Sequence, residues 1–475
     1  MDDFPTEKVY LDKKSPLESA RLFLASRSTD AGLATDYFHC GDPYHYNGTC
    51  YRILENDALR KDIYRWAETA WCWAGVGDNL REEPFHPNPR KVSDIIDAMR
   101  AEAHLPSSVP VPSWLDGRDA KATDYLPCAN GIVHLPSFLE GKPNYFTPST
   151  PAFFTTAALD YAFDERAPTP EKFLNFLVDI LEDDGEAMDL LQEWFGYALT
   201  PDTSQQKILL IHGPKRSGKG TAGRILTAML GRHNVAGPTL ASFQQNFGLQ
   251  PLICKSLALI ADARLSGKSD TSIIAERLLS ISGEDSLTID IKNRPPITTK
   301  LSARLVVLTN ELPKLSDASG ALASRFCIVR LKNSFFGKEN TALTGELLKE
   351  LPGILLWALD GWKRLRSQGR FTVPTSSAAA ARALEDLASP IGAFIRDICI
   401  VRAGQFVAVD ELFDRWKSWC ESEGRDHPGT KQSFGRDLSS AVPGLTISQP
   451  RDSSGSRFRA YEGIGIGIQC GGGAV

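Results

Sequence analysis

The sequence predicts an α/β fold organised around a parallel sheet, and three observations carry this prediction. A short apolar run at residues 208–211 is too brief for a helix and is followed by Gly213-Pro214, which is typical of a buried strand. A glycine-bounded loop comes next, and apolar residues then recur at helical spacing over residues 222–230. Two later apolar runs, at residues 256–261 and 304–309, each end at a polar side chain. The order strand, loop, helix, strand, strand favours a sheet with ligands at its carboxyl edge.

The loop after the first strand has the spacing of a phosphate-binding loop, because its glycines and Lys219 fit the pattern G-x-x-x-x-G-K. Backbone N–H groups of the loop and of the following helix turn can converge on a polyphosphate, and Lys219 adds a mobile positive charge. Gly220 stands where Ser or Thr usually binds magnesium, so either Thr221 or water completes the metal site. The predicted ATP-binding residues are Gly213, Pro214, Lys215, Arg216, Ser217, Gly218, Lys219, Gly220 and Thr221.

Polar residues follow the later strands. Asp262 comes after the second apolar run, where a carboxylate holds magnesium in P-loop enzymes, and its alternative role is to cap a turn or helix. Asn310 comes directly after the third run, with a turn cap as its alternative. Arg325 precedes a fourth apolar run at residues 327–331 and is either a functional arginine or a partner of Asp317.

Length and composition narrow the class of protein. The chain has 475 residues, 42% of them hydrophobic and 23% charged, which is ordinary for a globular protein of several domains. Its net charge of −5 gives no global attraction to nucleic acid, so DNA contacts would come from local basic patches. Nine scattered cysteines without C-x-x-C pairs argue against a disulfide framework or a zinc ribbon. No apolar run approaches the length of a membrane span, so we expect a cytoplasmic protein without a membrane partner.

The segments before the loop show clear local patterns. An Asn-Gly pair within residues 44–54 predicts a β-hairpin, and helices are predicted at residues 62–73 and 92–103. Apolar residues share helical faces over 173–181 and 190–197, which predicts a helical layer leading to the loop.

Four blocks follow one another along the chain. They are the loop after Gln205-Gln206-Lys207, the stretch from Ser282-Gly283-Glu284-Asp285 to Lys292, Thr309-Asn310-Glu311-Leu312-Pro313, and Gly320-Ala321-Leu322-Ala323-Ser324-Arg325-Phe326. In this order they resemble the superfamily III helicases, and within them the primase-helicase proteins of poxviruses, phages, satellite phages and plasmids. The resemblance extends from about Pro127 to the end of the chain. It implies an AAA+-like P-loop ATPase core with a helical collar, a homohexameric ring, ATP and Mg²⁺ as cofactors, and DNA as a partner.

The resemblance also implies a role for each matching residue. Lys219 would bind the outer phosphates, Asp262 would hold Mg²⁺ or polarise water, and Asn310 would orient the attacking water. Arg325 would reach the ATP of a neighbouring subunit as an arginine finger. Lys292 would contact a single strand in a central channel, with a solvated hairpin charge as the alternative reading. The family usually has a glutamate, often with a second acid, at the position of Asp262, so the group that activates water stays open.

The carboxyl-terminal part predicts a winged-helix domain. Its order is a helix at 391–398, a strand at 406–409, helices at 410–423 and 430–441, and a ribbon at 445–449 and 457–461. In such domains the last helix can enter the major groove of duplex DNA while the ribbon touches the backbone. A protein-binding or packing wing is the alternative, because acidic residues share the domain. The predicted DNA contacts are Lys431, Arg436, Arg451, Arg457 and Arg459.

We therefore predict an ATP-dependent DNA helicase or translocase that replicates a phage, plasmid or integrated mobile element. The alternatives are an ATP-gated origin-binding protein that does not unwind DNA, and a P-loop kinase, because Gly-Lys-Gly-Thr also ends the loop of adenylate-kinase-like enzymes. No primase catalytic block is visible before about residue 130, so priming is absent or comes from a separate primase or polymerase. The predicted domains are an N-terminal α+β region of unknown role at 1–125, a helicase-associated helical collar at 126–204, the superfamily III ATPase domain at 205–372, the winged helix at 385–465 and a flexible tail at 466–475.

Overall fold

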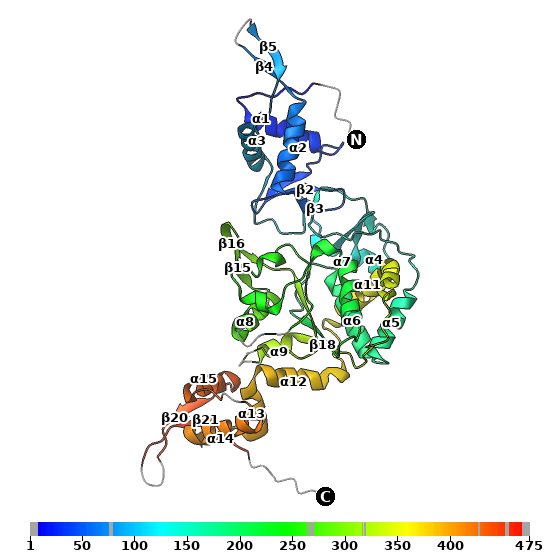
Figure 1. The fold of residues 1–475 in the computed structure, drawn as a ribbon. Coiled ribbons are helices and arrows are strands. Elements are labelled where there is room, and N and C mark those ends of the chain that lie inside the picture. The colour runs from blue at the N-terminus through cyan, green and yellow to red at the C-terminus, as the bar shows by residue number, and fades with distance from the viewer. Residues whose placement is uncertain are drawn as a thin grey trace. The chain divides into compact units, whose positions relative to one another are not determined.

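The computed structural model describes residues 8–75, 79–263, 265, 270–315, 317, 320–425, 428–451 and 456–467 (Figure 1). The chain forms two compact units. The first runs to Pro168 and also contains Leu199–Pro201 and Met229–Asn234, and the rest of the chain forms the second. Most of the predicted flexible tail lies outside the described residues. No helix in the described ranges is both long enough and apolar enough to span a bilayer.

The first unit combines helices with small sheets, of which the largest has the strand order β3-β2-β1-β6. Phe23 of α1, Phe38 of β1, Ile63 of α2 and Ile95 of α3 share one buried apolar cluster, so the helices cover a face of this sheet. The helices are α1 (Pro16–Arg27), α2 (Asn56–Glu68), α3 (Pro89–Glu102) and α4 (Leu135–Leu139), and the strands are β1 (Asp36–His39), β2 (Asp42–Tyr46), β3 (Tyr51–Ile53), β4 (Trp71–Ala74), β5 (Arg81–Pro84), β6 (His104–Leu105), β7 (Ser113–Trp114), β8 (Tyr125–Cys128), β9 (Gly131–His134), β10 (Phe146–Thr147) and β11 (Phe153–Phe154).

Two local predictions for this unit have different outcomes. The hairpin around Asn47-Gly48 is confirmed, because β2 and β3 pair antiparallel on either side of it. The helix predicted at 62–73 is wrong at its carboxyl end, since α2 ends at Glu68 and β4 begins at Trp71. Cys72 is buried while Trp73 is 54% exposed, so this stretch follows the two-residue period of a strand. The run of aromatic residues concealed that period.

Asp36 links three elements of the first unit through a buried ionic cluster. Its side chain is 5% exposed and accepts from Arg27 Nε at 3.1 Å and from Thr35 Oγ1 at 2.9 Å, and it lies 3.1 Å from His45 Nδ1. Arg27 also contacts Asp62 of α2 at 2.9 Å. Burial alone would raise the pKa of Asp36, but the hydrogen bond with His45 and the charge of Arg27 outweigh it and hold that pKa below its ordinary 3.8.

We expect Asp36→Asn to destabilise the first unit by about 3 kcal/mol at pH 7, because it leaves the half-buried Arg27 with Asp62 alone. A carboxylate with a lowered folded-state pKa stabilises the fold above its unfolded pKa and loses that effect as pH falls through the folded value. The difference from wild type should therefore shrink when denaturant titrations are repeated near pH 3. The exposed Asp30→Asn serves as the matched control. A difference that is the same at both pH values would contradict this account.

A five-stranded parallel sheet with the order β13-β14-β17-β12-β18 forms the centre of the second unit. The four strands predicted from apolar runs are confirmed within one or two residues. The fifth, β13, has only two residues and is too short for any period to predict. Every residue of β17 is buried, which is typical of a strand covered on both faces. The strands are β12 (Ile208–His212), β13 (Val235–Ala236), β14 (Leu257–Ile260), β17 (Arg304–Thr309) and β18 (Phe326–Arg330).

The predicted helical layer before the loop is confirmed as α5 (Glu171–Leu181) and α6 (Gly185–Ala198). In Figure 1, α6 lies beside α11 (Leu351–Gln368). Their backbones approach so closely that a Cβ at Gly196 would lie 2.1 Å from the carbonyl oxygen of Ala358. The fully buried Glu193 of α6 pairs with Arg364 of α11 at 2.8 Å and accepts from the Thr372 backbone N–H at 2.8 Å. This layer supports the loop from one side.

The remaining elements of the second unit include a hairpin and a carboxyl-terminal α/β segment whose sheet has the order β19-β21-β20. Two strands differ from the prediction: β19 begins at Cys399, seven residues before the predicted 406, and β21 begins at Ala460, within the predicted 457–461, and continues to Ile466. Glycines within β21 interrupt the alternation on which strand predictions depend. These elements are α7 (Lys219–Leu230), α8 (Thr271–Ser282), β15 (Ser286–Ile291), β16 (Arg294–Lys300), α9 (Ala321–Arg325), α10 (Leu343–Leu347), α12 (Ala378–Ala388), α13 (Pro390–Ile398), β19 (Cys399–Ala408), α14 (Val409–Ser422), α15 (Lys431–Ala441), β20 (Thr446–Ser448) and β21 (Ala460–Ile466).

Candidate functional site

The glycine-rich loop between β12 and α7 holds Lys219 at the first residue of the helix. The Lys219 ammonium donates to the carbonyl oxygens of Gly213 at 2.8 Å and Pro214 at 2.6 Å, and to Ser217 Oγ at 3.1 Å. Burial disfavours the charged form and lowers the pKa of Lys219. Because these three partners are neutral, they leave the positive charge of Lys219 uncancelled and able to act on an anion.

Two glycines of the loop are required by close backbone approach. Gly218 has φ +93°, and a Cβ there would lie 2.6 Å from Ile180 Cγ2 of α5. A Cβ at Gly213 would lie 2.7 Å from the carbonyl oxygen of Leu331. The Phe335 backbone N–H also donates to the carbonyl of Arg216 at 2.9 Å. The loop is therefore fixed from several sides, in front of the N-terminus of a twelve-residue helix.

The strand register brings Asp262 and Asn310 to the same edge of the sheet as the loop. His212 of β12 lies opposite Thr309 of β17, so Asn310, the next residue, follows beside the start of the loop. β14 pairs with the other side of β17 and ends at Ile260, and Asp262 follows it by two residues. Asp262 is exposed and Asn310 is half-buried. The carboxyl edge of a parallel sheet is the usual position for ligand-binding groups.

Thr221 and Asp262 are the predicted Mg²⁺ ligands. Thr221 Oγ1 lies on the first turn of α7 and accepts a hydrogen bond from Arg224 Nη2 at 3.0 Å. A hydroxyl oxygen and a single carboxylate suit Mg²⁺, which takes few protein ligands beside phosphate oxygens and keeps several waters. The donor set therefore fits the metal, and the Arg224 contact orients the hydroxyl.

His212 is a residue of this edge that sequence reasoning missed. Its imidazole lies near the backbone of Asn310, and its buried Nδ1 has no hydrogen-bond partner within the described part of the chain. Burial, followed by the nearby charges of Arg330 and Lys219, lowers the pKa of His212 below its ordinary 6.5, so the ring is neutral at pH 7. Its position in the sequence, directly before Gly213 of the loop, was the signal that could have identified it as a residue of this edge.

Arg325 lies at the opposite edge of the same sheet. It ends α9 directly before β18, whose first residue pairs with Ile208 at the start of β12. Its Nη1 donates to Gln206 Oε1 at 2.5 Å and to the Gln206 carbonyl at 3.3 Å. The five residues of β12 separate this edge from the loop, a distance of roughly 16 Å at the usual rise per residue. One chain therefore does not bring Arg325 together with Lys219, Asp262 and Asn310.

Lys292 occupies the tip of an antiparallel hairpin, as the alternating pattern before Arg294 indicated. β15 and β16 pair through Ile291 and Arg294, which leaves Lys292 and Asn293 as the turn. Asn293 has φ +62°, a conformation that asparagine tolerates, and Lys292 is exposed. The tip presents an exposed positive charge at the end of a two-stranded hairpin.

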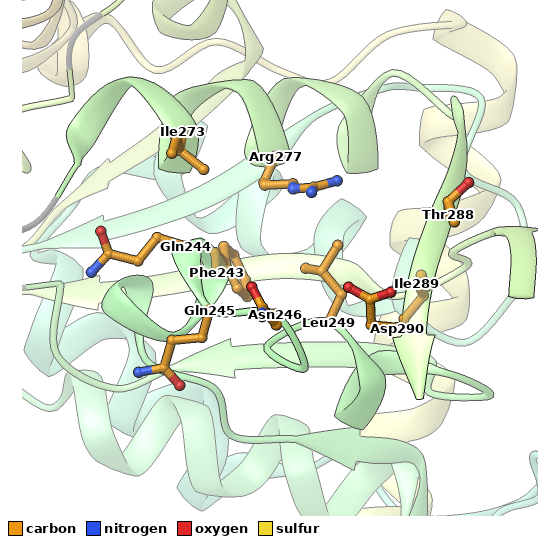
Figure 2. A pocket seen from close by; sticks show the side chains of 10 residues that line it. All are labelled: Phe243, Gln244, Gln245, Asn246, Leu249, Ile273, Arg277, Thr288, Ile289 and Asp290. Carbon is orange, nitrogen blue, oxygen red and sulfur yellow. The ribbon is translucent and has the colours of Figure 1, made fainter. Parts of the chain in front are cut away.

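A pocket of about 80 Å³ lies beside this hairpin (Figure 2). Its lining comes from the end of the 3₁₀-helix Leu240–Gln244 and the loop after it, from α8 and from β15. Arg277 of α8 and Asp290 of β15 are its charged side chains. None of the predicted ATP-binding residues lines this pocket, so it is separate from the candidate nucleotide site.

The predicted DNA contacts of the carboxyl-terminal segment are exposed basic residues that do not form one cluster of free charges. Lys431, at the start of α15, forms an ion pair with Asp410 of α14, and Arg436 pairs with its neighbour Asp437 at 3.0 Å. Arg457 and Arg459 are exposed just before β21, and the backbones of Arg451 and Arg457 form an isolated antiparallel β-bridge. Binding DNA through α15 would require phosphates to compete with the carboxylates that Lys431 and Arg436 already contact.

The fold and this edge define a mixed α/β protein with a glycine-rich loop at the carboxyl end of a parallel sheet. Residues 211–325 match a family of unknown function (DUF5906), and residues 388–450 match a family described as Poxvirus D5 protein-like. Two apo structures of the NrS-1 C terminal region have TM-scores of 0.50 with this chain, at 13% and 14% identity, and each match covers 96% of this chain and 100% of that chain. At this identity the likeness shows a similar fold. The poxvirus match supports the resemblance to primase-helicase proteins.

Proposed function

We propose that this protein is an ATP-dependent DNA translocase of the primase-helicase type, acting in replication as a ring of identical subunits. The observation that carries the proposal is the split of the predicted catalytic residues between opposite edges of one sheet. Lys219, Asp262 and Asn310 lie at the carboxyl edge and Arg325 at the amino edge. A subunit with this arrangement can complete a nucleotide site only with the Arg325 of a neighbour.

The strand order supports an AAA+-like P-loop core. The loop strand β12 lies between β17 and β18, and β14, which precedes Asp262, lies one strand further along. In this reading the loop backbone and Lys219 bind the phosphates, and Asp262 and Thr221 hold Mg²⁺, which neutralises phosphate charge. Asn310 orients the attacking water, and the neighbour's Arg325 stabilises the charge that develops in the transition state.

A single carboxylate, Asp262, follows β14, where the family usually has a glutamate and often a second acid. His212, whose pKa is lowered mainly by burial, lies near the backbone of Asn310. We assign it the role of holding the Asn310 backbone at the loop, so that the asparagine amide keeps its orientation toward water. Phosphoryl transfer depends on alignment and electrostatic stabilisation more than on a strong base, so one carboxylate is chemically sufficient.

DNA binding is assigned to two places. Lys292 at the hairpin tip suits a contact with the phosphates of a single strand, which needs no sequence readout. The order helix, strand, helix, helix, strand, strand from α13 to β21 supports a winged helix for duplex DNA, and the Poxvirus D5 protein-like match covers residues 388–450 of this segment.

A strand-displacement assay on forked DNA tests the proposal. We expect Lys292→Ala to lose unwinding while it keeps ATP hydrolysis in the absence of DNA, because the lysine contacts the strand and not the nucleotide. The slope of log K against log salt for single-stranded DNA should fall by about 0.7 for each phosphate contact that the ring loses. Lys363→Ala, an exposed lysine of α11, is the matched control and should unwind like wild type.

The same assay separates the alternatives. A protein that binds DNA in an ATP-dependent way but never displaces a strand would be an origin-binding protein. A protein that phosphorylates an acceptor without DNA would be a P-loop kinase. Either result would overturn the translocase.

A further inference from the structure

Gln206 and Glu284 form a polar network between the protein hairpin of β15 and β16 and the side chain of Arg325. Gln206 Oε1 accepts from Arg325 Nη1 at 2.5 Å, and Gln206 Nε2 donates to the Gly283 carbonyl at 3.3 Å. The Gln206 side chain also lies near the Glu284 carboxylate and acts to lower its pKa. The guanidinium of Arg325 is therefore held by a residue that is itself held by the turn between α8 and β15.

Glu284 extends the network to the hairpin. Its carboxylate contacts Lys300 Nζ at 2.7 Å and accepts a hydrogen bond from Thr203 Oγ1. Lys300 is the last residue of β16, the strand that descends from the Lys292 tip. Burial acts to raise the pKa of Glu284, but the hydrogen bonds from Lys300 and Thr203 outweigh it and lower that pKa, so the carboxylate is charged at pH 7.

The backbone of the network is held in an unusual conformation at two points. Gln206 has φ +53° and Glu284 has φ +67°, in the left-handed region that non-glycine residues seldom adopt. Such conformations persist only where surrounding contacts impose them. The contacts of Gln206 and Glu284 with Arg325, Lys300 and Thr203 supply that constraint, so loss of one contact would let both residues relax.

We propose that Glu284, through Gln206, is a positioning residue that couples the hairpin to the arginine of the same subunit. When the Lys292 tip binds DNA, a shift of β16 changes the ion pair between Lys300 and Glu284. This change then alters the hydrogen bond between Gln206 and Arg325. DNA in the channel would thereby set the rate at which the neighbouring subunit hydrolyses its nucleotide. This inference rests on the proposed function and adds the route of regulation to it.

The test measures ATP hydrolysis with and without single-stranded DNA and takes the ratio of the two rates, which cancels any loss of folded protein. We expect Glu284→Gln and Lys300→Ala each to lower this stimulation ratio at least fivefold, while the KM for ATP stays within about twofold of wild type. The double variant should lose no more than either single variant, because both remove the same contact. Glu276→Gln, an exposed glutamate of α8, is the control and should keep the wild-type ratio.

A charge swap provides the second measurement. Glu284→Lys combined with Lys300→Glu restores an ion pair in reverse, and we expect it to recover at least part of the stimulation lost in Glu284→Lys alone. Singles that keep the wild-type ratio, or losses that simply multiply in the double variant, would overturn the coupling while leaving the translocase intact. A wild-type enzyme that DNA does not stimulate would overturn both the coupling and the proposed function.

Discussion

Replacing Lys219 by alanine is expected to lower the rate of ATP hydrolysis by about 10²–10³-fold, the range for removing one group aimed at the developing charge. The loss should be large because Gly213, Pro214 and Ser217, the partners of the Lys219 ammonium, are neutral and leave its positive charge able to act on a phosphate. Hydrolysis measured by phosphate release at saturating ATP is the direct readout.

Nucleotide binding gives an independent readout of the same variant. ATP should raise the thermal midpoint of the wild-type protein, since a ligand that binds only the folded state stabilises it, and the rise should be smaller in Lys219→Ala. The exposed Lys363→Ala is the control and should match wild type in both measurements. Undiminished hydrolysis in Lys219→Ala would mean that the loop between β12 and α7 is not the nucleotide site.

Replacing Arg325 by alanine is expected to lower hydrolysis by about 10³-fold or more, as for other arginine fingers, although Arg325 lies at the sheet edge away from its own loop. The physical reason is that in the proposed ring the guanidinium would act on the neighbouring subunit's phosphates. ATP binding should change little, because the residues that hold the nucleotide belong to the other edge. Rates should be measured over a range of protein concentrations.

Mixing two inactive variants tests whether the arginine acts between subunits. A ring assembled from Lys219→Ala and Arg325→Ala subunits contains interfaces where an intact Lys219 faces an intact Arg325. Hydrolysis should reappear in the mixture, to about a quarter of the wild-type rate if equal amounts assemble at random and each interface acts independently. A monomer that hydrolyses ATP at full rate, or a mixture that stays inactive, would contradict a shared site.

Local sequence determined the elements of the core. The run at 208–211, the glycines of the loop and the helical spacing after Lys219 are patterns within some twenty residues, and the structure has β12, the loop and α7 at those positions. The bounds of two strands were predicted less accurately because their two-residue alternation is hard to detect. Aromatic residues surround Cys72 in β4, and glycines interrupt the alternation in β21.

Only the tertiary structure decided how the candidate site is divided. The sequence by itself predicted Lys219, Asp262, Asn310 and Arg325 as site residues. Which of them share an edge of the sheet depends on the order and register of the strands, because these arise from pairing between distant segments. The Gln206 contacts likewise join residues that are far apart in the chain. Local periodicity records which face of an element is buried, and it carries no information about which other element covers that face. That is why the elements could be predicted and the division of the site could not.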